Sequence, residues 1–170
     1  MTFNQYLQSE GACEPAVKWA GRKTIEEVVA TCHRGDWLLW LAKRCDIGLQ
    51  PLTLAKGHCA NTVRHLMKDE RSIKAVDVAI AFGEGKATRE ELDAAYAASD
   101  AAAYAAAAAY DAAAAYAAAA ADADAAAAAA ADADADAAVD ANRLQTADIC
   151  RKHIGELIVE KVNQILTETP

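Results

Sequence analysis

The sequence predicts an all-α protein, and three observations support this prediction. Helix-start patterns recur through the first half of the chain, and almost no segment shows the strict alternation of apolar and polar residues that marks a strand. Residues 94–141 contain 34 alanines, and alanine is the strongest helix former because it loses no side-chain rotamer entropy. We expect a compact multi-helix bundle whose long alanine-rich helical segment folds back on itself.

Capping and breaking residues divide the first part of the chain into short helices. Pro15 suits the first turn of a helix that ends at Gly21. Thr24 and Glu27 have the spacing of a capping box, which predicts a helix over 25–32.

Gly35 separates these helices from a strongly apolar one over 37–44. Asp36 can cap this helix, and its WLLWLA sequence is apolar almost all round. We therefore expect the helix to be largely buried at the centre of the core, with Trp37 and Trp40 among its anchors.

Two further helices are expected over 52–68 and 70–82, and the Gly-Glu-Gly at 83–85 ends the second. His58 and His65 are seven residues apart, so they would share one face of the first of these helices. A small structural polar cluster is the expected result.

The alanine-rich tract, residues 94–141, follows a second capping box formed by Thr88 and Glu91. As one rod it would be ~72 Å long at about 1.5 Å per residue, whereas a chain of this length folds to a globule about 40 Å across. We therefore expect at least one reversal, because Asp caps a new helix but is poorly placed inside one. The candidate breaks are Ser99-Asp100, Asp122-Ala-Asp124 and Asp132-Ala-Asp134-Ala-Asp136.

One domain is expected over residues 1–170. Its parts are apolar-core helices over 1–86, an Ala/Asp-rich helical layer over 87–141, and a C-terminal amphipathic helix over 142–170. Large apolar residues lie mainly outside the middle part, so the first and last parts are expected to supply most of the buried area.

The negative charge of the chain is concentrated in the tract. The net charge is −8, and residues 94–141 contain eight Asp and neither Lys nor Arg, so that elsewhere 17 acidic residues balance 17 basic ones. This distribution favours a basic protein partner or simple solubility. It argues against direct binding of nucleic acid, which needs clustered Lys and Arg.

Four aspartates of this region are regularly spaced. Asp93, Asp100, Asp111 and Asp122 are separated by 7, 11 and 11 residues. At about 100° per residue these intervals nearly superpose on a helical wheel, which places the carboxylates on one stripe of a continuous helix. Tyrosines lie close to this acidic stripe, and the candidate partner-binding residues are Tyr96, Asp100, Tyr104, Tyr110, Asp111 and Asp122.

Two interpretations of the acidic stripe stay open. The side opposite the stripe is nearly pure alanine, which lets helices approach closely, so the stripe can be the solvated face of a packed helical layer. The alternative is a recognition surface, in which Tyr gives contact area at low entropic cost and Asp gives charge complementarity.

The cysteines and histidines do not predict a metal site. His58 lies next to Cys59, and His153 follows Cys150 at a ligand-like spacing, but nothing nearby in the sequence completes either set. The chain shows no secretory leader, so reduced thiols in the cytoplasm are the simplest interpretation. The five cysteines are Cys13, Cys32, Cys45, Cys59 and Cys150.

No catalytic or cofactor-binding pattern is recognised. The Gly-Glu-Gly at 83–85 lacks the Lys-Ser or Lys-Thr pair of a phosphate loop, and the Asp spacing lacks the central Gly and bidentate Glu of a calcium loop. No run of large apolar residues approaches the ~20 needed to span a bilayer. We expect a non-enzymatic binding protein without cofactor, metal or membrane segment.

Two stretches of the sequence resemble a known family. They are Arg34–Arg44, RGDWLLWLAKR, and Leu52–Leu66, LTLAKGHCANTVRHL. With shorter stretches further along, they are similar to immunity proteins of the Imm5 type over about residues 20–155. The resemblance implies a small protein of bacteria or their phages that binds and neutralises a cognate toxin, and it carries over no catalytic residues.

The expected function is therefore that of an intracellular protein inhibitor. One alternative is a phage-type anti-defence inhibitor, or an acidic nucleic-acid mimic, that acts on a basic enzyme. Another is ice or surface binding, because 11-residue periodicity in alanine-rich helices is typical of type I antifreeze proteins. The Thr array of those proteins is missing, since no Thr occurs between Thr88 and Thr146.

Overall fold

The computed structural model describes residues 1–101 and 125–168, and every regular element in these residues is a helix. The predicted all-α class is confirmed. The first elements are α1 (Phe3–Ser9), α2 (Glu14–Ala20), α3 (Ile25–Thr31), α4 (Gly35–Arg44), α5 (Leu49–Asn61), the short 3-10 helix η1 (Arg64–Leu66) and α6 (Glu70–Gly83). A helical segment over 89–101 and the 44-residue helix α8 (Ala125–Glu168) follow.

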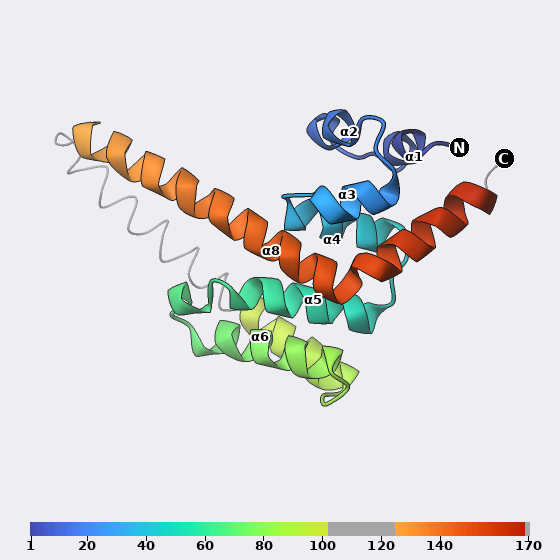
Figure 1. Cartoon of the computed structure of the whole chain (residues 1–170). Helices are drawn as coiled ribbons and strands as arrows, with labels where there is room; N and C mark the ends of the chain where they lie inside the picture. The colour runs from blue at the N-terminus through green and yellow to red at the C-terminus, as the bar shows by residue number, and fades with distance from the viewer. Residues whose placement is uncertain (102–124, 169–170) are drawn as a thin grey trace.

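Helix α8 is the element against which most of the others pack. It contacts α3, α4 and α5 directly, and α1 also touches it. Figure 1 shows α8 crossing the whole molecule, with its first part extending beyond the other described helices. The buried residues of α8 recur every three or four positions, as expected for one apolar helix face, and they are Ala147, Cys150, Ile154, Ile158 and Val162.

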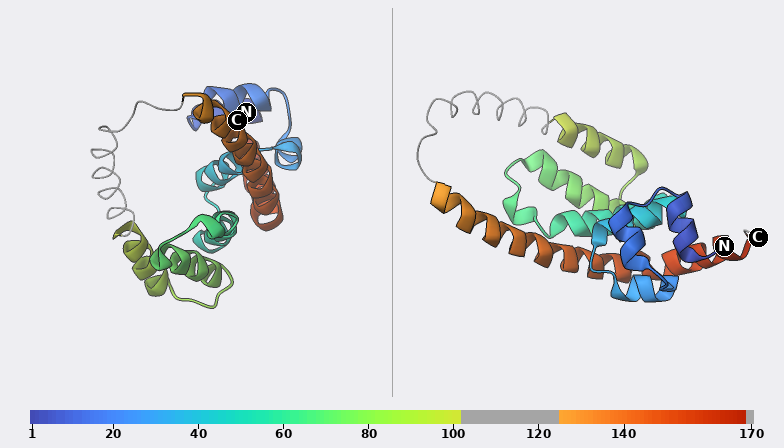
Figure 2. Two further views of the ribbon diagram at one scale, coloured as in Figure 1. Left: turned by 90° about the vertical axis from the view of Figure 1, so that its left-hand side faces the viewer. Right: turned by 90° about the horizontal axis from the view of Figure 1, so that it is seen from above.

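Helix α5 lies between α8 and a second group of helices. It packs on α8 on one side and on α6 on the other. The close approach of α5 and α6 depends on Gly57, because a Cβ atom there would lie 2.9 Å from Cγ1 of Ile80. The segment 89–101 lies beside α6, as the two views of Figure 2 show. Its residues Leu92 and Ala95 are buried.

The two predicted capping boxes are confirmed. In α3, Thr24 Oγ1 accepts a hydrogen bond from the Glu27 amide at 3.3 Å, while Glu27 Oε2 accepts one from the Thr24 amide at 2.8 Å. Thr88 and Glu91 exchange the same pair of bonds at the start of segment 89–101. Each such cap stabilises a helix by about 1 kcal/mol.

Three expectations about the first half are corrected. Asp36 does not cap α4, because it lies inside the first turn and its carboxylate binds Arg34 instead. His65 does not share a helix with His58, since α5 ends at Asn61 and His65 lies in η1. The WLLWLA run is buried on one side only, at Leu38, Leu41 and Ala42, while Trp37, Leu39 and Trp40 are partly exposed.

The alanine-rich tract is helical wherever the structure describes it. The candidate break at Ser99-Asp100 is wrong, because the helix continues to residue 101, and the one at Asp132–Asp136 is wrong, because α8 runs through it. The candidate at Asp122–Asp124 lies outside the described residues. Segment 89–101 and α8 run in roughly opposite directions in Figures 1 and 2, so the chain does fold back between them.

The C-terminal amphipathic helix is part of α8 and does not begin at residue 142. Some large apolar residues expected in the core are exposed instead, since the exposed fractions of Leu144 and Leu157 are 53% and 38%. In the ranges 1–101 and 125–168, no helix combines the length and the apolar character needed to cross a membrane.

Candidate functional site

Two of the six candidate partner-binding residues fall in the described part of the chain. Tyr96 and Asp100 both lie on segment 89–101, where Tyr96 is 40% exposed and Asp100 is exposed. The other four lie outside the described residues and are Tyr104, Tyr110, Asp111 and Asp122. The structure therefore brings one Asp and one Tyr of the candidate set onto the same helical segment.

Tyr96 also packs against the helical body. It lines a shallow cavity of about 290 Å³ between α5, α6 and segment 89–101, opposite Met67 and Val76. Partial burial raises the pKa of its phenol. One side of the Tyr96 ring thus packs against the helices, and the other side stays exposed to solvent. This placement fits both interpretations of the acidic stripe.

The exposed face of α8 carries apolar and acidic side chains together. Val139 and Leu144 have exposed fractions of 48% and 53%. Leu144 lies four residues from both Asp140 and Asp148, so the three side chains share one helix face. Asp140 is paired with Arg143 at 2.7 Å and Asp148 with Arg151, but both carboxylates stay more than 70% exposed. Exposed pairs of this kind add little to stability.

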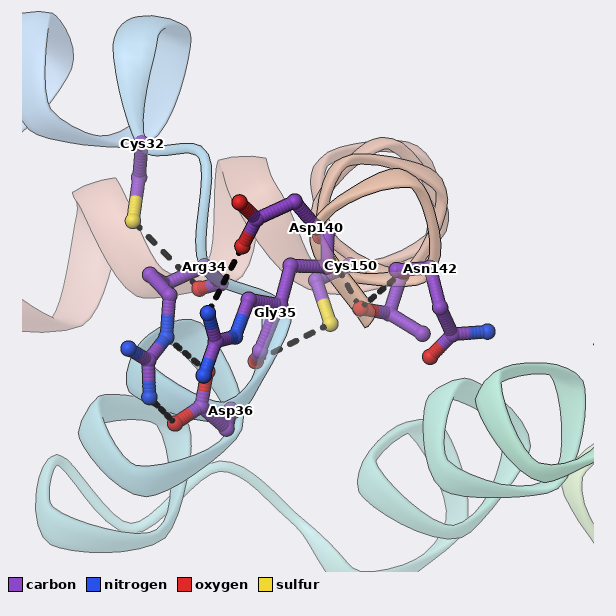
Figure 3. A network of polar contacts seen from close by, with 9 residues as sticks. Cys32, Arg34, Gly35, Asp36, Asp140, Asn142 and Cys150 are labelled. Atoms are coloured by element: carbon purple, nitrogen blue, oxygen red, sulfur yellow. Dashed lines mark hydrogen bonds and ion pairs between the residues drawn. The ribbon is translucent and has the colours of Figure 1, made fainter. Parts of the chain in front are cut away.

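The junction between α3 and α4 holds a polar network that sits close to α8, shown in Figure 3. Nε and Nη2 of Arg34 donate to the two carboxylate oxygens of Asp36 at 2.8 and 2.6 Å, and this guanidinium lowers the pKa of the Asp36 carboxyl. Two thiols complete the network, because Cys32 donates to Arg34 O at 3.4 Å and Cys150 to Gly35 O at 3.6 Å. The network fixes the start of α4 against α8.

Arg151 of α8 extends these contacts to the end of α3. Its Nη1 atom donates to Cys32 O at 2.6 Å, next to the last turn of α3. A cation is favourable at this place because the carbonyl groups of a helix C-terminus carry partial negative charge. The end of α3 is thereby fixed to the part of α8 that follows the tract.

A cavity of about 400 Å³ lies among α1, α2, α3 and α4. Its walls are mostly apolar and include Trp19, Trp37 and Trp40, with Arg34 and Asp36 also in the lining. The Trp19 and Trp37 rings are 5.9 Å apart, and Arg34 lies 4.9 Å from the Trp37 ring. Such a cavity has the size and lining to take an apolar group. The sequence predicted Trp37 and Trp40 as core anchors, and nothing in the spacing indicated a cavity.

A second cluster, where α5 crosses α8, joins residues that are distant in the sequence. The thiols of Cys59 and Cys150 are 3.8 Å apart. The rings of His58 and His153 stack with their centroids 4.6 Å apart and their planes at 12°. Sequence analysis singled out each half of this Cys/His cluster but could not bring the halves together.

The Cys/His cluster is not a preformed metal centre. Among the residues that the structure describes, no group of three or more His, Cys, Asp or Glu side chains is arranged to hold a metal ion. Both cysteines are free thiols. Burial lowers the pKa of His153, and the neighbouring His58 and Lys152 add to this shift.

Comparison with known proteins adds no relative to these observations. No family model matches the chain, no curated protein matches it, and no solved structure matches it. The resemblance of residues 34–44 and 52–66 to immunity proteins therefore stays a prediction. The described geometry offers two candidate sites, an exposed acidic and apolar face of α8 and the Cys/His cluster where α5 crosses α8.

Proposed function

We propose that this chain is a non-enzymatic protein inhibitor that binds a basic protein partner through its alanine-rich tract, in the manner of an immunity protein that neutralises a toxin. The distribution of charge carries this proposal. Residues 94–141 contain eight Asp without a single Lys or Arg, while the rest of the chain is balanced. A one-signed surface of this kind speeds encounter with a partner of opposite charge and disfavours partners of like charge.

The exposed part of α8 supports the same proposal. Charge complementarity guides association, but a stable complex also needs apolar contact area that is freed from water. Leu144 offers such area on the helix face that also carries Asp140 and Asp148. The exposed fractions of Leu144, Asp140 and Asp148 leave this face accessible to a partner, and Figure 1 shows the first part of α8 extending from it beyond the other described helices.

The segments that resemble immunity proteins have a clear structural role in this proposal. Residues 34–44 and 52–66 cover α4 and most of α5, and both helices pack directly on α8. The resemblance therefore lies in the scaffold that holds the tract, and the tract supplies the charge that a basic partner would recognise.

The test uses the protein encoded beside this chain, because a toxin and its inhibitor must be made together. Bacterial growth is measured with that neighbouring protein expressed alone and with this chain, and Kd is measured by calorimetry. Asp100→Lys combined with Asp111→Lys is expected to weaken binding by about 100-fold, since each reversed charge at a complementary surface costs about tenfold.

A matched control reverses two charges elsewhere. Glu156→Lys combined with Glu160→Lys makes the same charge change on exposed residues of α8 outside the tract, and this variant is expected to bind and protect like the wild type. Far-UV circular dichroism checks that both variants keep their helices. Unchanged binding by the Asp100 and Asp111 variant would remove the tract as the interface, and absence of both binding and growth protection would overturn the inhibitor proposal.

A nucleic-acid mimic would use the same acidic surface on a different target. Duplex DNA would then compete with this chain for the partner, and the competition would weaken steeply as salt is raised. A toxin-specific inhibitor would show the charge dependence of the variants without such competition.

A further inference from the structure

The crossing of α5 and α8 brings two thiols into contact that lie 91 residues apart in the sequence. The Sγ atoms of Cys59 and Cys150 are 3.8 Å apart and share a weak hydrogen bond. A disulfide bond has an S–S distance of about 2.05 Å, so the two sulfur atoms must approach by about 1.8 Å in all. That approach is shared between two side chains.

The surroundings of the two sulfur atoms differ. Cys150 is fully buried on the apolar face of α8, whereas Cys59 is only partly buried on α5. Each thiol also reaches a backbone carbonyl, Thr146 O for Cys59 at 3.7 Å and Gly35 O for Cys150 at 3.6 Å. Cys59 is therefore the more accessible of the two residues to a small reagent, and Cys150 lies deeper in the core.

We propose that Cys59 and Cys150 form an oxidisable dithiol, a modification site at which hydrogen peroxide produces an intramolecular disulfide between α5 and α8. Cys59 is the attacking residue and Cys150 is the resolving residue. This assignment follows from their exposure, and it does not depend on the proposed inhibitor function.

The pKa directions agree with these roles. The hydrogen bond from Cys150 lowers the pKa of Cys59, which favours the nucleophilic thiolate. The same hydrogen bond, together with burial, raises the pKa of Cys150. Cys150 therefore keeps its proton until the second step.

The reaction balances in two steps. The Cys59 sulfur attacks one peroxide oxygen, the O–O bond breaks, and the products are a sulfenic acid on Cys59 and one water molecule. The Cys150 sulfur then attacks the Cys59 sulfur, so that an S–S bond forms and the S–O bond breaks. The Cys150 thiol proton leaves with the hydroxide as a second water molecule. The two thiols are oxidised and the peroxide is reduced.

The remaining cysteines are distinguishable from this pair. Cys13 is exposed near the start of α2 and can react only on its own or with another molecule. Cys32 and Cys45 are buried, and burial raises the pKa of both thiols, to about 11 for Cys45. A buried thiol with a raised pKa reacts slowly with peroxide.

Disulfide formation would link α8 covalently to α5, and through α5 to the helices that pack on it. Cys59 lies on α5, which packs on α6, and Cys150 lies on α8. The bond would therefore join the α5 and α6 part of the fold, which precedes the alanine-rich tract, to α8, which contains the end of the tract. Oxidation then restricts how far these two parts can separate.

The experiment treats the full chain carrying Cys13→Ser with a small molar excess of hydrogen peroxide, followed by alkylation and non-reducing tryptic digestion. Trypsin releases Cys59 in the peptide 57–64 and Cys150 in the peptide 144–151. Mass spectrometry is expected to find these two peptides linked, with the loss of two hydrogen atoms, and a phosphine reductant is expected to separate them. The Tm of the oxidised protein is expected to rise by about 10 °C, because the bond closes a long loop in the unfolded chain.

Two variants and one control make the result decisive. In the Cys13→Ser background, Cys59→Ala and Cys150→Ala are each expected to abolish the linked peptide. Cys59→Ala is also expected to leave Cys150 unoxidised by hydrogen peroxide. Cys45→Ala removes a different buried thiol and is expected to leave the link intact. Circular dichroism checks that each variant is folded.

Several results would overturn the proposal. They are a Cys59 that proceeds to sulfinic acid without a link in the folded protein, a link from Cys150 to Cys32, and a linked protein with a lower Tm than the reduced one. The last result would mean that the bond traps a distorted conformation. None of these measurements uses the toxin or any other partner, so their failure is separate from a failure of the inhibitor proposal.

Discussion

The contact between α4 and α8 predicts that Gly35→Ala destabilises the protein. A Cβ atom at residue 35 would lie 2.5 Å from Oγ1 of Thr146 and 2.6 Å from its carbonyl carbon. The carbonyl carbon belongs to the backbone of α8 and cannot rotate away. The added methyl group therefore forces α4 and α8 apart by most of an ångström.

The size of the effect follows from two opposing contributions. Overpacking of a well-packed contact typically costs about 1 to 3 kcal/mol, and here Leu38 and Leu41 on α4 move with the backbone and lose contact with the core. Replacing Gly by Ala within a helix gains at most about 1 kcal/mol, and less in the first turn. We expect the free energy of unfolding to fall by about 2 kcal/mol.

Urea denaturation measures this change, with tryptophan fluorescence and far-UV circular dichroism as probes, because Trp37 and Trp40 lie on α4 itself. Gly155→Ala is the matched control within α8. A Cβ atom there would lie 3.1 Å from Cγ1 of Val29, a side-chain methyl group that can shift, so its stability is expected to stay within about 1 kcal/mol of the wild type. A Gly35→Ala protein as stable as the wild type would refute the reasoning.

Two further predictions concern buried groups. The Tyr6 hydroxyl is buried with no hydrogen-bond partner among the described residues, and burial raises its pKa to about 12. Tyr6→Phe is therefore expected to leave the free energy of unfolding unchanged or to raise it by up to about 1 kcal/mol. A clear fall in the free energy of unfolding, measured by urea denaturation, would reveal a hydrogen-bond partner of this hydroxyl. The pKa of His153 is lowered in the folded protein, so the unfolded chain binds more protons at this residue. The contribution of His153 to stability is therefore complete above its ordinary pKa, and it declines as the pH falls through the pKa of the folded protein. Urea midpoints measured between about pH 7.5 and pH 5 should fall less for His153→Gln than for the wild type, and parallel profiles would contradict this assignment.

Local structure was predictable because its causes are local. The bonds that start α3 at Thr24 and segment 89–101 at Thr88 join residues three positions apart, so the sequence pattern contains the whole interaction. The same pattern, Thr2 followed by Gln5, starts α1. That helix was not predicted, although the signal for it is present in the sequence.

Asp36 illustrates a prediction that local competition defeated. An Asp in front of an apolar run is a good cap, but Arg34 offers this carboxylate a two-point ion pair, and the helix begins at Gly35, two residues before the predicted start. The exposed Leu144 illustrates a second kind of error. Its surroundings depend on which face of α8 meets α4 and α5, and an alanine-rich helix gives little indication of that.

The candidate sites differ in how far the sequence could reveal them. The acidic stripe is a pattern along the chain, so spacing placed Tyr96 and Asp100 close together on a continuous helix, and the structure shows that the helix does continue through the candidate break at Ser99-Asp100. The Cys59 and Cys150 pair depends on the packing of α5 against α8 across 91 residues. Single-sequence patterns carry no information about such a contact, which is why the cysteines were predicted only as separate reduced thiols.

Because α8 is continuous, a small tilt of the helix at one contact displaces its far end. From the α4 contact at Thr146 to its start at Ala125, α8 is one uninterrupted helix, about 30 Å long at 1.5 Å per residue. A tilt of about 5° at the α4 contact moves the far end by roughly 3 Å, by the geometry of a rod of that length. A force applied at the start of α8, such as the binding of a partner, is thus transmitted to α4, the helix that carries Trp37 and Trp40. The fluorescence of these two residues can therefore report binding that occurs well away from them.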